Sequence, residues 1–570
     1  MLTKHAGKYP LMLIALVVFL LAASDSALGA ATITVVNIDG LNEGFNDPTP
    51  VAPVGGNPGT TRGQQRLIAF QFAADLWGAT LDSNVQVRVN AAFNPLGANV
   101  LGSAGTTFVF SDFGGVFPFP GAQFGNTWYH SALADKRAGA ELNPGFADIN
   151  AQFSSNFNFY LGLDNNHGAL NDLVVVVLHE LAHGLGFSAF VNSSTGANFA
   201  GRTDIFSRFA FDNTVGLFWN NMTNAQRQAS AINFGNLVWV GGNVTADVPN
   251  VLSFGSPSVR IDSPPVIAGL KQFGTAAFGP PISAPGITAP VMLVNDGVAP
   301  TSDGCEALPA GSLTGKIALI DRGLCGFVVK AKIAQNAGAL AVIIANNVAG
   351  APPGMAGVDP TVVIPSVSIS LADGNAIKAQ LAGGVVATLS VDLSVRAGAD
   401  PAGRARLNAP NPVQPGSSVS HFDPIAFRNQ LMEPAINPDL THNLTAPEDL
   451  TLAQMRDVGW FADAQLDGIP DDVQICMQQG PISLTYNTST GQYLFFDCSK
   501  GISLTGVGTV AQNFCKLTLT DKGPVPKIPD RNVSILVNTC TGDGNATISF
   551  GGKTYSISDG NISVGSCGCL

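Results

Sequence analysis

Residues 171–187 read NDLVVVVLHELAHGLGF, and within this stretch two histidines and a glutamate, all candidate functional residues, lie within five positions. Its valine run, residues 174–177, is β-branched, so propensity alone would predict a strand. A fully buried helix tolerates such a run at a cost of about a few tenths of a kcal/mol per residue. Asp172 also places a carboxylate where the dipole of a helix favours negative charge. We therefore predict a buried helix over this stretch.

Two histidines, His179 and His183, lie four residues apart in this stretch. On a helix they share one face, with Cβ atoms about 5 to 6 Å apart, and two imidazoles so placed can bind one tetrahedral zinc ion. Glu180 then flanks the metal without ligating it. A carboxylate in that place takes the proton from a zinc-bound water, whose pKa the metal has lowered to about 7. The pattern indicates hydrolysis of an amide bond, with Glu180 as the base.

A catalytic zinc usually has three protein ligands, and the third is missing from its ordinary place. An HExxHxxGxxH motif would have its third histidine at position 189, but the chain has Ala189 there, although Gly186 of the motif is present. No Glu occurs between Glu180 and Glu306, which disfavours a downstream glutamate ligand. Three histidines have no partner at ligand spacing and are interpreted as ordinary side chains: His130, His167 and His442.

The stretch from His179 to Ser188 resembles the active-site helix of leishmanolysin-like metzincins, in which a long insertion after the motif's glycine delays the third histidine. That resemblance implies a later histidine followed by a Met-turn. The sequences SHFDP, residues 420–424, and LMEP, residues 431–434, are similar to the His and Leu-Met spacing of that family. The resemblance therefore implies that His421 is the third zinc ligand and that Met432 lies beneath the metal without binding it.

A second resemblance covers most of residues 264–395. GCE at 304–306, GKIALIDRG at 315–323, CGF at 325–327 and the stretch 338–347 are similar to a protease-associated (PA) domain. Local patterns predict strands at 316–321 and 341–345 with a helix at 328–337 between them, a compact α/β unit. It contains no visible nucleophile, base or metal cluster, so it is expected either to dock or gate substrate or to be a structural insertion. Cys305 and Cys325 are expected to form a disulfide.

The first thirty residues are typical of a cleaved export signal. Lys4 and Lys8 precede the apolar run 11–23, and small residues follow it. The alternative, an uncleaved anchor, is disfavoured because the run is shorter than the roughly 20 residues that a spanning helix needs. We expect cleavage after Gly29 or Ala30, secretion, and no stable membrane span thereafter. The formal net charge of −12, without any basic stripe, argues against nucleic-acid binding.

The C-terminal region is set apart by its cysteines. Six of the eight cysteines fall between Cys476 and Cys569, where strand-like alternation predicts a small disulfide-stapled β module with 15 allowed pairings. Just before it, DGIPDD at 467–472 resembles one calcium-binding repeat of the thrombospondin type 3 kind. One carboxylate-rich turn is a weak calcium signal, and a solvated linker is the favoured interpretation.

Together these patterns predict an α+β protein in several domains, as 570 residues require. We expect a signal peptide, 1–30; a metzincin-like catalytic domain in two parts, 31–262 and 396–463; a PA domain inserted between them, 263–395; and a cysteine-rich β module, 464–570. Within the first part, a strand, helix, strand order is expected near residues 32–36, 62–77 and 85–89. In the second part, Thr445 and Glu448 stand in capping-box spacing and predict a helix that ends before Gly459.

The function predicted from these features is that of a secreted zinc metalloendopeptidase acting on protein or peptide substrates. Residues 147–153 alternate between apolar and polar side chains and are expected to form an edge strand that receives an extended peptide. Two alternatives stay open. The first is a secreted binding or adhesion protein with a structural zinc, for which no convincing fourth ligand is visible. The second is an exopeptidase, because PA domains also occur in zinc aminopeptidases, although those resemble a different metal-site pattern.

Overall fold

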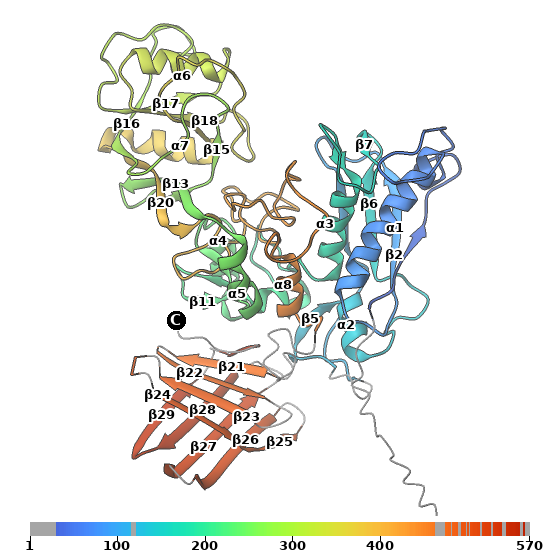
Figure 1. Cartoon of the computed structure of the whole chain (residues 1–570). Helices are drawn as coiled ribbons and strands as arrows, with labels where there is room; N and C mark the ends of the chain where they lie inside the picture. The colour runs from blue at the N-terminus through green and yellow to red at the C-terminus, as the bar shows by residue number, and fades with distance from the viewer. Residues whose placement is uncertain are drawn as a thin grey trace, which may run out of the picture.

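The computed structural model describes residues 30–115 and 121–461 together with much of the C-terminal region, in the segments 474–479, 481–487, 492–497, 499–500, 502–513, 516–525, 528–538, 543–558 and 562–564. The expected signal sequence, residues 1–29, and the turn at 467–472 lie outside these residues. Figure 1 shows three bodies: an N-terminal body that also contains the brown segment near residue 440, a yellow-green α/β lobe, and an orange-red β body.

The N-terminal body is built on a four-stranded sheet in the order β1-β2-β6-β3. The first three strands are parallel, and β3 closes the sheet as an antiparallel edge strand. Helices α1 and α3 pack together, and the indole N–H of Trp77 on α1 donates to the carbonyl of Leu178 on α3 at 3.0 Å. The bounds of these elements are β1 (Ile33–Asn37), α1 (Arg62–Thr80), β2 (Val87–Asn94), β3 (Gly102–Thr106), β6 (Ile149–Ser154) and α3 (Leu173–Leu185). The expected strand, helix, strand order is therefore present.

The expectation that residues 147–153 form the edge strand was wrong. β6 alternates between buried and exposed side chains as expected, but it lies between β2 and β3. Alternation reports which face of a strand is buried and says nothing about its neighbours in the plane of the sheet. The edge is β3, whose sequence GSAGT has no apolar alternation to detect.

The valine run at 174–177, for which propensity alone predicts a strand, is part of helix α3. Every residue of α3 except His183 is buried, so tertiary packing decides the conformation against local propensity. The carboxylate of Asp172 caps the helix by accepting the N–H of Val174 at 2.8 Å. The helix ends at Gly186, whose φ of 148° suits glycine.

Residues on both sides of the inserted lobe share one hydrophobic core. The side chain of Asp457 on α8 (Thr451–Asp457) accepts hydrogen bonds from Trp239 and from Asn243, which lie before the lobe. Between residue 397 and α8 the chain has no helix or extended strand, only turns and isolated bridges. The helix predicted from Thr445 begins later than expected, at Thr451. The expected capping box is not formed, since the Thr445 N–H donates to Asn443 and the Glu448 carboxylate accepts from the Thr441 hydroxyl.

Shorter elements complete the N-terminal body: β4 (Val109–Phe110), β5 (Thr127–His130), α2 (Ser131–Ala138), β7 (Phe159–Tyr160), β8 (Asn171–Asp172), β9 (Thr203–Asp204), β10 (Ala210–Asp212), β11 (Leu217–Phe218), α4 (Asn224–Ser230), β12 (Leu237–Trp239) and α5 (Gly242–Val251).

The inserted lobe is an α/β unit around an eight-stranded sheet, in the order β14-β13-β20-β16-β17-β18-β19-β15. β13 carries the chain into the lobe and β20 carries it out, and the two are antiparallel partners. The predicted strand, helix, strand succession is present as β17, α6 and β18, and a disulfide joins Cys305 to Cys325 with Cα atoms 5.7 Å apart. The bounds are β13 (Phe254–Ser263), β14 (Gly269–Lys271), β15 (Phe273–Thr275), β16 (Ile287–Leu293), β17 (Ile317–Asp321), α6 (Phe327–Asn336), β18 (Ala341–Ala345), β19 (Ser366–Ile369), α7 (Leu371–Gln380) and β20 (Val386–Arg396).

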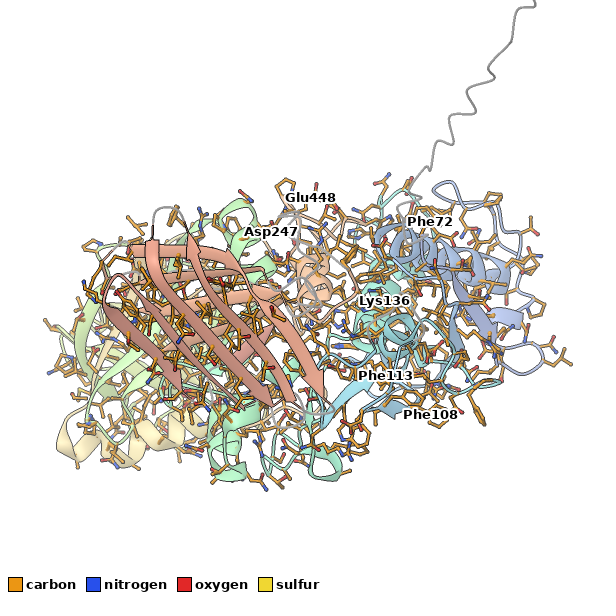
Figure 2. All side chains as sticks on the ribbon, turned by 90° about the horizontal axis from the view of Figure 1, so that it is seen from below. Phe72, Phe108, Phe113, Lys136, Asp247 and Glu448 are labelled. Carbon is orange, nitrogen blue, oxygen red and sulfur yellow. A yellow bond between two sulfur atoms is a disulfide. The ribbon has the colours of Figure 1, made fainter. Side chains whose placement is uncertain are left out.

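The C-terminal body consists of two five-stranded antiparallel sheets that share one apolar core. Seen from below, its strands run side by side across one end of the molecule, and the labelled Phe108, Phe113 and Lys136 lie on the N-terminal body beyond them (Figure 2). Cys476 lies on β21, whereas the other five C-terminal cysteines fall outside the described residues, so the expected disulfide network stays a prediction. The strands are β21 (Gln474–Gln479), β22 (Ile482–Asn487), β23 (Gln492–Asp497), β24 (Ile502–Val507), β25 (Thr509–Asn513), β26 (Lys516–Val525), β27 (Ile528–Asn538), β28 (Asp543–Phe550), β29 (Lys553–Ser558) and β30 (Ile562–Val564).

Within the part of the chain that the structure describes, no helix has both the length and the apolar character needed to cross a membrane.

Candidate metal centre

Three histidines meet beside helix α3, where they line a cleft. His179 and His183 come from α3, and His421 comes from the irregular segment beyond the inserted lobe. One ring nitrogen from each lies within 4.8 Å of the others, and the Nε2 atoms of His179 and His421 are 3.3 Å apart. The structure thus brings together the three residues that the sequence singled out as ligands, although 242 positions separate the first from the last.

The other nitrogen of each ring, Nδ1, donates to a backbone carbonyl. His179 donates to Leu431 at 2.7 Å, His183 to Phe187 at 2.8 Å, and His421 to Ser417 at 2.9 Å. Because Nδ1 carries the proton in each ring, all three Nε2 atoms present lone pairs to the same point. Carbonyl acceptors of this kind orient metal-binding imidazoles in proteins.

The donor set fits zinc in both geometry and charge. Two nitrogens bound to a tetrahedral zinc at about 2.0 to 2.1 Å lie roughly 3.3 to 3.4 Å apart, which matches the separation of His179 and His421. Burial lowers the pKa of His179 to about 3 and that of His183 to about 4, and it lowers the pKa of His421 well below the usual value. The rings are therefore neutral, which is the state in which imidazole ligates a metal.

Glu180 lies between the metal-binding face of α3 and the edge strand β3. Burial raises the pKa of its carboxyl to about 8, while a hydrogen bond from the backbone N–H of Ala104 on β3 acts in the opposite direction. A divalent cation beside it favours the ionised form. Gly102 leaves room for this carboxylate, because a Cβ at position 102 would lie 2.8 Å from Cγ and 2.9 Å from Oε1 of Glu180.

The segment around Met432 is tied to two of the three histidines. The carbonyl of Leu431 holds the ring of His179, and the carbonyl of Met432 accepts the N–H of Phe422, next to His421. Met432 itself is fully buried in the core. The carboxylate of Asp449 accepts the N–H of Leu431 at 2.6 Å, so a buried acid fixes the peptide that orients a ligand. No sequence pattern marked Asp449 for this role.

Ala189 occupies the position of the third histidine in the HExxHxxGxxH motif, and a hydrogen bond from Ala189 holds the segment that carries His421. The backbone N–H of Ala189 donates to the hydroxyl of Ser420 at 3.0 Å. The residue that follows Ser420 is His421, so the later segment is bonded to the very position at which the shorter motif would have its third histidine.

The metal centre opens into a cleft of about 910 Å³. One wall is residues 99–104, which include most of the edge strand β3, and the other walls are 188–189, 191–194, 413–418 and 434–436. Apart from the three histidines and Glu180, the polar side chains that line the cleft are those of asparagine, glutamine and serine. Among the described residues that line it, Glu180 is the only one with a carboxylate, and none is a lysine or arginine.

The remaining histidines lie outside the cluster, as expected. His442 donates from Nε2 to the carboxylate of Asp172 at 3.0 Å, His167 contacts the carbonyls of Leu170 and Pro438, and His130 contacts Ser188. The cluster offers three histidines and no fourth His, Cys, Asp or Glu within the described residues. A site with three protein ligands that faces a cleft retains an open position, as catalytic zinc sites do.

Comparison with known proteins identifies one domain. Residues 287–377 match the family model for the PA domain. The chain therefore contains a PA domain, which runs from β16 into α7 of the inserted lobe.

Among curated proteins, a probable leucine aminopeptidase 2 from Aspergillus fumigatus is 39% identical over 126 residues, which are 21% of this chain and 23% of that protein. The chain thus matches about a quarter of the length of this relative. A match of 126 residues cannot contain all three histidines, because His179 and His421 are 242 positions apart.

Solved structures give weaker likenesses. A zinc aminopeptidase from Bacillus subtilis has a TM-score of 0.20 at 22% identity, over 33% of this chain and 42% of that one. A peptidase M28 precursor from Shewanella amazonensis has 0.19 at 18%, over 38% and 50%, and a subtilisin-like protease from a Pseudoalteromonas species has 0.19 at 23%, over 25% and 34%. Scores this low do not assign the fold of the whole chain.

Proposed function

We propose that this chain is a secreted zinc-dependent endopeptidase of the leishmanolysin-like metzincin kind. The observation that carries the proposal is the convergence of three Nε2 lone pairs beside Glu180, at the base of an open cleft. His179, His183 and His421 would hold the metal, and Met432 would lie in the packed turn beneath it. The bound zinc would activate a water and polarise the scissile carbonyl.

Glu180 performs the proton transfers in this proposal. Its carboxylate takes a proton from the attacking water and delivers it to the nitrogen of the leaving amine. The Ala104 N–H and the empty space at Gly102 hold that carboxylate against β3. The same strand lines the cleft as a sheet edge, so an extended peptide can pair with its free backbone groups and lie across the metal.

The cleft wall favours cleavage within a chain over removal of a terminal residue. An aminopeptidase needs an acidic group for the substrate's ammonium, and a carboxypeptidase needs a basic group for its carboxylate, because burying an unpaired charge is costly. The described residues that line the cleft include no Lys or Arg, and their only carboxylate, Glu180, is assigned to the reaction. The non-enzymatic alternative, a binding protein with a structural zinc, is disfavoured because such sites close with a fourth ligand.

The test compares the wild type with Glu180→Gln. Zinc content should stay the same in the variant, whereas hydrolysis of casein should fall by about 10² to 10⁴. A peptide library with acetylated N-termini and amidated C-termini should be cleaved as well as its unblocked counterpart. Casein hydrolysis by the variant at the wild-type rate would contradict the role of Glu180. Stepwise release of single residues from free N-termini alone would replace endopeptidase by aminopeptidase.

Secretion belongs to the same proposal and rests on the pattern of residues 1–30. N-terminal sequencing of the protein recovered from culture medium should begin at Ala30 or Ala31. Recovery only with the membrane fraction, with Met1 retained, would support the anchor instead.

A further inference from the structure

A histidine and a serine lie in contact next to the backbone of the metal ligand His183. His130, the last residue of β5, is fully buried, and its Nε2 lies 2.7 Å from the hydroxyl oxygen of Ser188. Ser188 follows the end of α3 and lines the cleft. The region around β5 is found in Figure 2 by the labelled Phe113, whose ring packs on Tyr129 at 5.4 Å.

The direction of this hydrogen bond follows from the partners of both groups. The Ser188 hydroxyl lies 3.2 Å from the backbone carbonyl of His183, which can only accept, so the single hydroxyl proton is directed there. The hydroxyl oxygen therefore accepts from Nε2–H of His130. Consistent with one N–H on a neutral ring, burial lowers the pKa of His130 to about 3, and its Nδ1 has no hydrogen-bond partner.

These contacts exclude a serine nucleophile. Such a pair needs a histidine that accepts the serine proton and is oriented by a third group. Here the histidine donates to the serine, and its other nitrogen faces no carboxylate. The pair is therefore suited to holding a neighbour in place, and that neighbour is the metal ligand His183, whose backbone carbonyl accepts the Ser188 hydroxyl proton.

Three consecutive residues connect this pair to two ligands. The carbonyl of Phe187 accepts from the His183 ring, the hydroxyl of Ser188 donates to the His183 backbone, and the N–H of Ala189 donates to Ser420. Ser420 immediately precedes His421. Residues 187–189 thus contact the second ligand twice and the neighbour of the third ligand once, and His130 anchors them from the body of the protein.

We propose that His130 and Ser188 are positioning residues of the metal centre. They hold residues 187–189 in the arrangement that brings His183 and His421 to one ion. The inference rests on the proposed function only in taking zinc as the metal, and zinc affinity tests it separately from proteolysis.

The experiment measures zinc affinity by competition with a chromogenic chelator, and the absorption spectrum of the cobalt-substituted protein. His130→Leu and Ser188→Ala should each weaken zinc binding by about 10- to 100-fold and change the cobalt bands. Peptidase kcat should fall while KM changes little. His130→Gln, whose amide N–H can replace Nε2–H, should restore affinity to within a few-fold of wild type.

A matched control lies at the other end of α3. His442 bonds to Asp172, the residue that caps this helix, at 3.0 Å. His442→Gln should lower Tm without changing zinc affinity or the cobalt spectrum. If His130→Leu and Ser188→Ala behave like this control, their role is structural only and the proposal is wrong.

Two further outcomes are decisive. If His130→Leu does not fold, Ser188→Ala, which removes one oxygen at the cleft surface, decides the question. A wild type that binds no zinc overturns the proposal. A wild type that binds zinc with the expected loss in the variants, but cleaves no peptide, contradicts the proposed function and leaves this inference standing.

Discussion

Helix α3 and the segment 397–450 supply the same metal centre in opposite ways. α3 positions two histidines through regular backbone hydrogen bonds, and its side chains are almost all buried hydrocarbons. The later segment has no helix or extended strand, and its turns are held by buried polar side chains that bond to backbone groups. Asp449 binds the N–H of Leu431 and of Thr451, and the Glu433 carboxylate binds the N–H of Gln430.

This difference predicts how strongly the position of each ligand depends on single hydrogen bonds around it. A ligand on a helix inherits its position from many redundant bonds, so the loss of one has a small effect. A ligand on an irregular segment depends on individual buried side chains, and the removal of one leaves backbone donors without partners. Ligands of equal chemical importance therefore differ in how they respond to changes around them.

The largest effect is expected when the ligands themselves are removed. His179→Ala on the helix and His421→Ala on the irregular segment should each weaken zinc binding by more than the roughly 100-fold that outer-shell changes cause and abolish proteolysis. Equilibrium dialysis with zinc analysis, together with casein hydrolysis, checks this. Full zinc occupancy and activity in His421→Ala would sink the assignment of the third ligand.

An intermediate effect is expected one step away from the ligands, and here the two regions should differ. Asp449→Ala leaves two buried N–H groups unpaired and should lower the free energy of unfolding by about 2–4 kcal/mol and zinc affinity by about 10- to 100-fold. Asp172→Ala, at the cap of α3, should cost about 1–2 kcal/mol with unchanged zinc affinity. Urea unfolding measures the free energy of unfolding of each variant, and zinc titration measures its zinc affinity. Equal losses of zinc affinity in the two variants would contradict the proposed difference between the helix and the irregular segment.

The smallest effect on the metal is expected at the edge strand. Gly102→Ala places a methyl group 2.8 Å from Cγ of Glu180, so the flexible carboxylate must move. We expect kcat to fall by about 10- to 100-fold with zinc affinity unchanged. Gly105→Ala on the same strand is the control, because nothing lies within 4 Å of a Cβ there. Equal kinetics of the two variants would show that Gly102 does not position Glu180.

The same contrast explains how much the sequence could predict. The helix could be predicted because its motif lies within five residues, and the PA domain because short motifs between residues 304 and 347 resemble that family. The edge strand could not, since GSAGT in β3 carries no periodic signal and is defined by its pairing with β6. His421 came from a resemblance in spacing. Asp449 and Ser188 bond to backbone groups and His130 bonds to the Ser188 side chain, and these contacts between distant positions leave no pattern in the sequence.

The order of the chain also sets an order of events during biosynthesis. At about 5–20 residues per second, His421 is made roughly 10 to 50 s after His179, and the PA lobe is made in between. Because β13 and β20 pair, the lobe can fold with its two ends together before the segment 397–450 is made. A nascent chain in that interval has two ligands and Glu180 but an incomplete centre. The proposed protease therefore has no complete metal centre until the segment 397–450 has been synthesised.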